Sequence, residues 1–229
     1  MCGGGNELAT KSGKTVGQYA CNSVVAAAKY LAKLPYIDGK HMGLRGHSFG
    51  GSETNFLVTH TKLFKAASEM AGPSDQISGY LTLLPTNNNK EDSKEQQSIR
   101  EYGQIRFAAT LWQKPDFYIR ESSVLYADRV TTPLLMIHNK NDDGVQFRQG
   151  VEFFMALRHL NKRVWMLQYD NGNHFVSGQD SVDYTIRLTQ FFDHYLKETL
   201  PPVWLTEGVP AYEKGIRSGY ELDKSGKTP

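Results

Sequence analysis

The sequence predicts an α/β domain built on a doubly wound, mostly parallel β-sheet. Three observations lead to this prediction: strand patterns alternate with helix patterns, the run PLLMIH at 133–138 is almost entirely apolar, and a glycine-rich turn at 46–50 joins a strand pattern to a helix pattern. Apolar runs of this kind are typical of parallel strands that are covered on both faces. Alternating strands and helices indicate crossover connections within one sheet.

The elements before the glycine-rich turn are a lead, a helix and a strand. Residues 1–18 are polar and rich in glycine, and we expect them to form a flexible lead. The segment 22–34 has apolar residues at helical spacing and ends at a proline. The run 41–45 is predicted as the strand that enters the turn, and 52–60 as the helix that leaves it.

The middle of the chain is predicted to hold one strand and a long insertion. The run 63–71 is the strand, and residues 74–123 form a less regular, aromatic-rich segment. Within this insertion, 87–92 reads as a polar loop and 99–112 could hold a helix. Insertions between strands often carry groups that contact substrate. Most of the rings are expected to pack the insertion, and Tyr80 is the candidate for substrate binding.

The last part of the chain returns to regular alternation. Its elements are a buried strand at 133–138, an amphipathic helix at 145–160, a strand at 164–169 and a helix at 181–196. Residues 201–229 contain several prolines and few apolar side chains. We expect this tail to wrap the surface or to be disordered in part.

Composition and charge exclude several classes of function. The 229 residues fit one large domain or two small ones, with 39% hydrophobic and 22% charged residues. A net charge of +2 with scattered basic residues predicts neither nucleic-acid binding nor membrane binding. Two cysteines are too few for a disulfide framework, and no metal site is expected. We find no apolar run that could span a bilayer and no secretory signal, so the compartment stays unknown.

The turn Gly-His-Ser-Phe-Gly at 46–50 fits the pattern G-x-S-x-G. In this nucleophile elbow a sharp turn between strand and helix lifts the serine clear of the sheet. Side chains at 46 and 50 are expected to clash with the neighbouring strand and helix, which explains both glycines. The backbone N–H of Phe49 would lie where an oxyanion forms, at the positive end of the helix. A three-position pattern also arises by chance, so its context has to support it.

That context is an acid and a histidine in the chain order of this elbow. A serine hydroxyl needs a base within hydrogen-bond reach, and the base needs an anion that orients it. Ser48, Asp142 and His174 each follow a predicted strand, and the carboxyl ends of parallel strands meet at one edge of a sheet. We therefore predict that these three form a catalytic triad. Asp143 is the alternative acid, although it could instead cap the helix that follows.

The other histidines are weaker candidates for the base. His47 lies inside the elbow and is expected to fill space there. His138 ends a strand and is expected to be buried and hydrogen-bonded. The remaining four, on helices or at the start of a strand, are expected to be solvated or to pack: His41, His60, His159 and His194.

Three motifs together resemble the C-terminal catalytic domain of the prolyl oligopeptidase family of serine peptidases. They are GHSFGG at 46–51, PLLMIHNKNDDGV at 133–145 and NGNHF at 171–175, and the similarity covers most of residues 16–214. The resemblance implies an α/β-hydrolase fold, the triad Ser48, Asp142 and His174, acyl-enzyme chemistry and no cofactor. Together with the composition of the two ends, it predicts a division into the lead 1–18, a partial catalytic domain 19–200 and the tail 201–229.

The chain departs from this family's pattern in ways that bear on activity. The family's sheet normally has eight strands, and roughly four are predicted here, so the first strands are missing. The loop that normally supplies a second oxyanion donor is missing with them, which leaves the Phe49 N–H. Loss of one such donor can cost about a hundredfold in rate. Asn139 and Asn173 stand at two positions that are usually glycine.

The missing strands also affect the surface and the function. The elbow strand would become an edge strand with unpaired backbone groups, so we expect the chain to form homo-oligomers or aggregates through that edge, or to be a fragment of a longer product. Three functions stay open: a serine peptidase of prolyl oligopeptidase type that cleaves peptide or ester bonds, a carboxylesterase for small esters, and a truncated, catalytically impaired hydrolase that serves as a subunit or binding protein.

Overall fold

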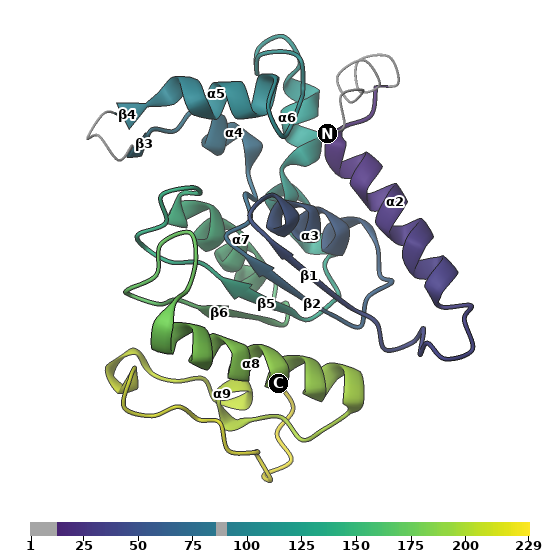
Figure 1. The fold of residues 1–229 in the computed structure, drawn as a ribbon, viewed down its shortest axis with the longest axis vertical. Coiled ribbons are helices and arrows are strands. Elements are labelled where there is room, and N and C mark those ends of the chain that lie inside the picture. The colour runs from purple at the N-terminus through teal and green to yellow at the C-terminus, as the bar shows by residue number, and fades with distance from the viewer. Residues whose placement is uncertain (1–12, 86–90) are drawn as a thin grey trace.

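The fold is built on a four-stranded parallel sheet, as the sequence predicts. A computed structural model describes residues 13–85 and 91–229, so the first twelve residues of the predicted lead and most of the predicted polar loop lie outside the described residues. The strand order is β1-β2-β5-β6, and every neighbouring pair is parallel (Figure 1). The strands are β1 (Gly43–His47), β2 (Ala66–Met70), β5 (Leu134–Ile137) and β6 (Val164–Leu167).

Helices cover both faces of this sheet, which confirms the doubly wound arrangement (Figure 1). On one face, Leu135 and Ile137 of β5 pack in a cluster with α8 (Gly178–Lys197). On the other face, Leu134 and Met136 pack against α7 (Phe147–His159), and α3 (Phe49–His60) covers β1 and β2. Successive side chains of a strand point to opposite faces, so the apolar run of β5 serves both clusters.

The helix before the sheet, α2 (Val16–Leu31), begins six residues earlier than the predicted start at 22. The Thr15 N–H donates to Gln18 Oε1 at 3.0 Å, which is half of a capping box. The Gly17 N–H donates to a buried carboxylate oxygen of Glu121 at 3.0 Å. Residues 16–18 of the predicted flexible lead are therefore helical, and the sequence prediction for them is wrong.

The insertion folds into short elements above the sheet (Figure 1). They are α4 (Gln76–Tyr80), β3 (Leu84–Pro85), β4 (Glu91–Asp92), α5 (Ser93–Glu101), α6 (Pro115–Glu121) and the 3-10 helix η1 (Ser123–Arg129). The prediction of a helix over 99–112 is wrong, because α5 ends at Glu101. Beyond it, Arg106 and Ala108 have positive φ angles of 56° and 52°, which an α-helix cannot contain.

The C-terminal tail wraps the surface and adds to the core. Its elements are α9 (Val203–Thr206) and the 3-10 helix η2 (Ala211–Glu213). Trp204 and Leu205 are buried in the cluster beneath α8, and Trp165 of β6 donates its indole N–H to the Leu205 carbonyl at 2.9 Å. No helix in the described parts of the chain is both long and apolar enough to cross a lipid bilayer.

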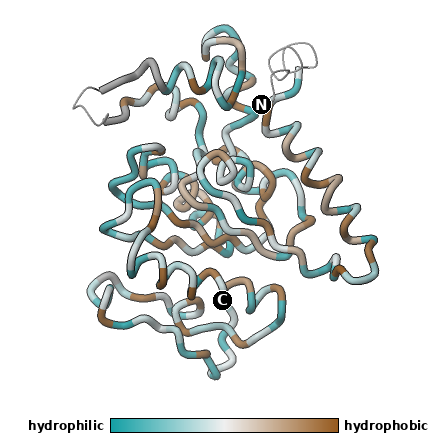
Figure 2. Tube along the Cα trace, in the orientation of Figure 1, coloured by the Kyte–Doolittle hydropathy of each residue, from teal (hydrophilic) through white to brown (hydrophobic). Residues whose placement is uncertain are grey.

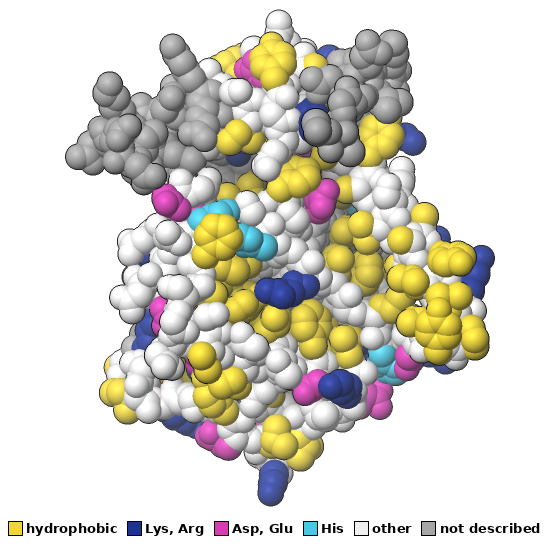
Figure 3. Space-filling model, viewed as in Figure 1, with side chains coloured by type: hydrophobic (Ala, Val, Ile, Leu, Met, Phe, Trp, Pro, Cys, Tyr) yellow, Lys and Arg dark blue, Asp and Glu magenta, His cyan; other side chains and the backbone are white. Residues whose placement is uncertain are grey.

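The elbow strand β1 lies at an edge of the sheet. Among the described strands it pairs with β2 alone, and its residues Gly43 and Arg45 are exposed, whereas every residue of β2 is buried. Figure 2 shows hydrophobic segments along α2, and Figure 3 shows yellow hydrophobic side chains over the face that carries α2 and β1. The prediction of an edge position for this strand is confirmed.

Candidate active site

The nucleophile elbow forms where the sequence predicts it. β1 ends at His47, α3 begins at Phe49, and Ser48 lies between them with φ 58° and ψ −118°. A non-glycine residue in this region stores roughly 1–3 kcal/mol of strain. The Ser48 N–H donates to the Met70 carbonyl at 2.8 Å, which fixes the turn to the end of β2. The serine side chain is thereby held above the carboxyl edge of the sheet.

Two glycines, Gly46 and Gly51, allow the close approach of the backbone at this turn, whereas the sequence analysis predicted positions 46 and 50. A Cβ at Gly46 would lie 1.9 Å from the Gly50 carbonyl oxygen, so no larger residue fits. A Cβ at Gly50 would meet nothing within 4 Å, so the predicted clash at that position is wrong. The close approach occurs one residue later, because a Cβ at Gly51 would lie 2.8 Å from both the Gly72 Cα and the Met70 carbonyl oxygen.

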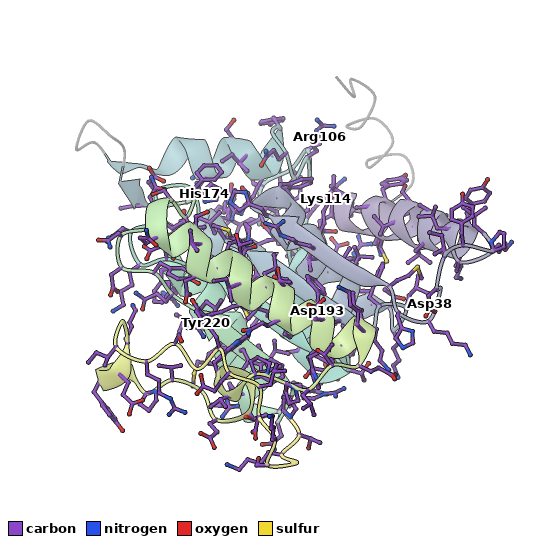
Figure 4. All side chains as sticks on the ribbon, turned by 60° about the horizontal axis from the view of Figure 1, so that its bottom comes forward. Asp38, Arg106, Lys114, His174, Asp193 and Tyr220 are labelled. Carbon is purple, nitrogen blue, oxygen red and sulfur yellow. The ribbon has the colours of Figure 1, made fainter. Side chains whose placement is uncertain are left out.

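The structure brings Ser48, His174 and Asp142 together. His174 Nε2 lies 2.8 Å from Ser48 Oγ, and His174 Nδ1 lies 2.9 Å from Asp142 Oδ1. The three residues follow β1, β6 and β5, respectively. They therefore meet at the carboxyl ends of the strands, as the sequence predicts. Figure 4 labels His174, which lies in the segment that leads into α8. Its side chain is 14% exposed, whereas that of Asp142 is fully enclosed.

Asp142 is held as an anion. Its Oδ1 also accepts the N–H groups of Gly144 at 2.9 Å and Val145 at 2.7 Å. Burial alone would raise the pKa of this carboxyl, but the contacts from His138, His174 and Val145 outweigh burial and hold the pKa well below its usual range. The alternative acid Asp143 is exposed and makes no contact with His174, so the geometry selects Asp142.

His138 is fully buried behind the acid, as the sequence predicts. Its Nε2 donates to the Val145 carbonyl at 3.0 Å and lies 3.3 Å from Asp142 Oδ2. Burial lowers the pKa of His138, but the neighbouring carboxylates of Asp142 and Glu69 raise it overall. Glu69 on β2 is also fully buried, and desolvation raises its pKa to about 7 despite the Gly72 N–H that it accepts. A cluster of titratable groups therefore underlies the site.

Two polar residues that touch the histidine turn were missed by the sequence reasoning. His47, predicted to fill space, places Nε2 2.9 Å from the His174 carbonyl oxygen. Asn139 donates from Nδ2 to the Asn173 carbonyl at 3.0 Å. Contacts from side chains to backbone carbonyls leave no periodicity in a sequence. Only their positions could have indicated them, because His47 ends a strand directly before Ser48, and Asn139 lies between the end of a strand and Asp142.

The predicted oxyanion donor, the Phe49 N–H, lies beside the insertion, and the predicted substrate residue, Tyr80, lies within it. Phe49 is the first residue of α3, so its N–H has no acceptor within the helix. Its ring packs against a cluster that includes Tyr80 and Tyr118. Tyr80 is 3% exposed, and its hydroxyl donates to Glu101 Oε1 at 2.6 Å. Burial and the neighbouring Glu101 raise the pKa of Tyr80 to about 12, so the hydroxyl stays protonated.

A parallel sheet with an elbow serine, and with an acid and a histidine at neighbouring strand ends, defines the α/β-hydrolase class. Within residues 13–85 and 91–229 no group of three or more His, Cys, Asp or Glu side chains is arranged to hold a metal ion. The family model described as the prolyl oligopeptidase family matches residues 2–199. The chain therefore belongs to the prolyl oligopeptidase family of serine peptidases.

Known relatives are much longer than this chain. The uncharacterized peptidase YuxL of Bacillus subtilis is 28% identical over 182 residues, which cover 75% of this chain and 25% of the relative. The inactive dipeptidyl peptidase 10 of Mus musculus is 22% identical over 187 residues, or 81% of this chain and 21% of that protein. The solved Pyrococcus horikoshii acylaminoacyl peptidase shares the fold, with a TM-score of 0.65 at 23% identity, over 78% of this chain and 28% of its own. The chain thus spans about a quarter of these proteins.

Proposed function

We propose that this chain is a serine hydrolase of prolyl oligopeptidase type, which cleaves peptide or ester bonds through an acyl-enzyme on Ser48. The observation that carries the proposal is the continuous contact from Ser48 Oγ through His174 to Asp142, at 2.8 and 2.9 Å. These distances lie within the range that general-base catalysis requires. Membership in a serine peptidase family supports the same reaction class.

In the proposed reaction Ser48 Oγ attacks the substrate carbonyl carbon while its proton moves to His174 Nε2. The carbonyl oxygen becomes an oxyanion, and the Phe49 N–H is the donor that we assign to it. The C–N or C–O bond then breaks, and the leaving amine or alcohol takes the proton from His174. Water repeats the sequence, with His174 as its base, and releases the acid and the free serine. The enclosed carboxylate of Asp142 stabilises the imidazolium in both halves.

We assign Tyr80 to the support of a substrate-binding wall beside Ser48. Its hydroxyl donates to Glu101 and the residue is only 3% exposed, so Tyr80 would act from behind, by supporting the exposed ring of Trp112. Phe49 packs against the same cluster, which links the wall to the residue that carries the oxyanion donor. Trp112, whose ring lies 6.1 Å from that of Tyr80, is 74% exposed and extends the aromatic surface outward.

A fluorescent fluorophosphonate probe tests the proposal. The probe phosphonylates an activated serine, so we expect the wild-type chain to be labelled and the Ser48→Ala variant to stay unlabelled. A heat-denatured sample is the control for adventitious labelling. Labelling that persists in Ser48→Ala, or a folded wild-type chain that never reacts, would overturn the assignment.

A second candidate is a catalytically impaired hydrolase that acts as a subunit or binding protein. The open edge of β1 and the similarity to an inactive dipeptidyl peptidase favour it. The probe separates it from the first candidate, because an impaired site would not react. A third candidate, a small-ester carboxylesterase, is separated by comparing a p-nitrophenyl ester series with an X-Pro peptide series. Cleavage of esters with no cleavage of peptides would favour the esterase.

A further inference from the structure

We propose that His47 and Asn139 are positioning residues that hold the His174 turn from two sides. The proposal rests on the proposed function, since it assigns a role in placing the base of that reaction. The two side chains reach the carbonyl oxygens of consecutive residues, Asn173 and His174. Neither contacts Ser48 Oγ or the imidazole nitrogens of His174 by a hydrogen bond, so both act through the backbone of the turn.

His47 holds the turn from the elbow side. A carbonyl oxygen can only accept, so the contact of 2.9 Å from His47 Nε2 to the His174 oxygen requires a proton on Nε2. The His47 ring also lies 4.8 Å from the ring of His174 and 4.8 Å from that of Phe175. Because His47 directly precedes Ser48, this contact fixes the nucleophile and the base relative to each other.

Asn139 holds the turn from the acid side. Its Nδ2 donates to the Asn173 carbonyl, and its Oδ1 accepts the Tyr169 N–H, both at 3.0 Å. One buried amide therefore ties both ends of the turn to the loop that carries Asp142. A Cβ at Gly172 would lie 2.3 Å from Asn139 Nδ2, so the turn passes close over this amide. Asn139 is 1% exposed, which keeps water from competing for these bonds.

The double hold has a physical purpose in this site. The turn lies in irregular backbone between β6 and α8, where no ladder of hydrogen bonds sets its position. His174 must keep Nε2 on Ser48 and Nδ1 on Asp142 together. A displacement of about 1 Å in such a constellation can cost about a hundredfold in rate. Two side chains that grip adjacent carbonyls restrict the rotation that would swing the imidazole away.

Four variants test the proposal, with p-nitrophenyl acetate as the substrate and the fluorophosphonate probe as a second readout. His47→Phe keeps a ring and removes the donor, whereas His47→Gln offers an amide N–H in its place. Asn139→Asp keeps an oxygen for the Tyr169 N–H and removes the donor to Asn173. Asn141→Ala is the matched control, because Asn141 donates to the same turn at Asp170, 3.1 Å away, but not beside His174.

We expect His47→Phe and Asn139→Asp to lower kcat and the labelling rate about 10- to 100-fold with little change in KM. His47→Gln should recover part of the loss, and Asn141→Ala should stay within about twofold of wild type. Thermal melting of each variant shows whether it is folded at the assay temperature. Folded His47→Phe and Asn139→Asp variants that react at the wild-type rate would overturn the proposal, and so would a loss in Asn141→Ala as large as theirs. Failure of the wild-type chain to react overturns the proposed function instead, so the two failures are distinct.

Discussion

Replacing Asp142 with asparagine separates the charge of the acid from its geometry. In this site Oδ1 alone accepts three N–H groups, from His174, Gly144 and Val145. The two backbone donors require an oxygen at that position, so the asparagine carbonyl should take it. The His174 Nδ1–H then keeps its acceptor, and Nε2 remains free to accept the Ser48 proton.

The expected loss is therefore the electrostatic part of the contact. At an effective dielectric constant of about 20 and a charge separation of about 4 Å, a carboxylate stabilises an imidazolium by about 4 kcal/mol. This corresponds to about a thousandfold in rate. An amide that forced the wrong histidine tautomer would cost about ten-thousandfold.

The assay is the rate of acylation by p-nitrophenyl acetate in Asp142→Asn, with Asp143→Asn as the matched control. Asp143 is exposed and contacts neither His174 nor Ser48, so its variant should stay within about threefold of wild type. A loss smaller than tenfold in Asp142→Asn, or an equal loss in both variants, would refute the reasoning.

Three further predictions concern the elbow, the buried acid and the open edge. Gly46→Ala should lower the melting temperature, because its Cβ would lie 1.9 Å from a carbonyl oxygen, while Gly50→Ala, with open space around its Cβ, should not; equal melting temperatures would contradict this. Burial raises the pKa of Glu69 from its usual 4.5 to about 7, so the wild-type chain loses stability as pH rises between these values. Glu69→Gln should remove that decline. The free energy of unfolding of the variant minus that of the wild-type chain, measured with denaturant, should therefore be about 3 kcal/mol higher at pH 8 than at pH 4. A difference between the two chains that does not change with pH would count against the buried acid. The edge of β1 should drive self-association, so light scattering should report a mass that rises above 25.8 kDa with concentration, and a constant monomer mass would argue against it.

The parts of the site that could be predicted are those that chain order and strand ends define. Ser48, Asp142 and His174 each follow a strand, and the geometry of a parallel sheet then brings them to one edge. Their catalytic role stays a prediction. The contacts of His47 and Asn139 with the His174 turn were not predicted, because they depend on how two loops meet in space, which no local sequence pattern records.

The fold shows the same division between pattern and context. The apolar run of β5 identified a strand buried on both faces, and the structure bears this out. The start of α2 was missed because Gly17 and its neighbours look flexible alone, but they pack against Glu121 from a distant part of the chain. The burial of Trp204 and Leu205 in the core was not predicted, because two apolar side chains in a proline-rich segment give no periodic signal.

The account depends above all on covalent catalysis by Ser48. The direct measurement is an acid quench of the chain during turnover of p-nitrophenyl acetate, followed by digestion and mass spectrometry of the peptides. We predict an acetyl group on the peptide that carries Ser48, and none in a parallel reaction of His174→Ala. A burst of turnover with no acetyl group on Ser48, or acetylation of Ser48 that is as fast in His174→Ala as in the wild-type chain, would contradict the account.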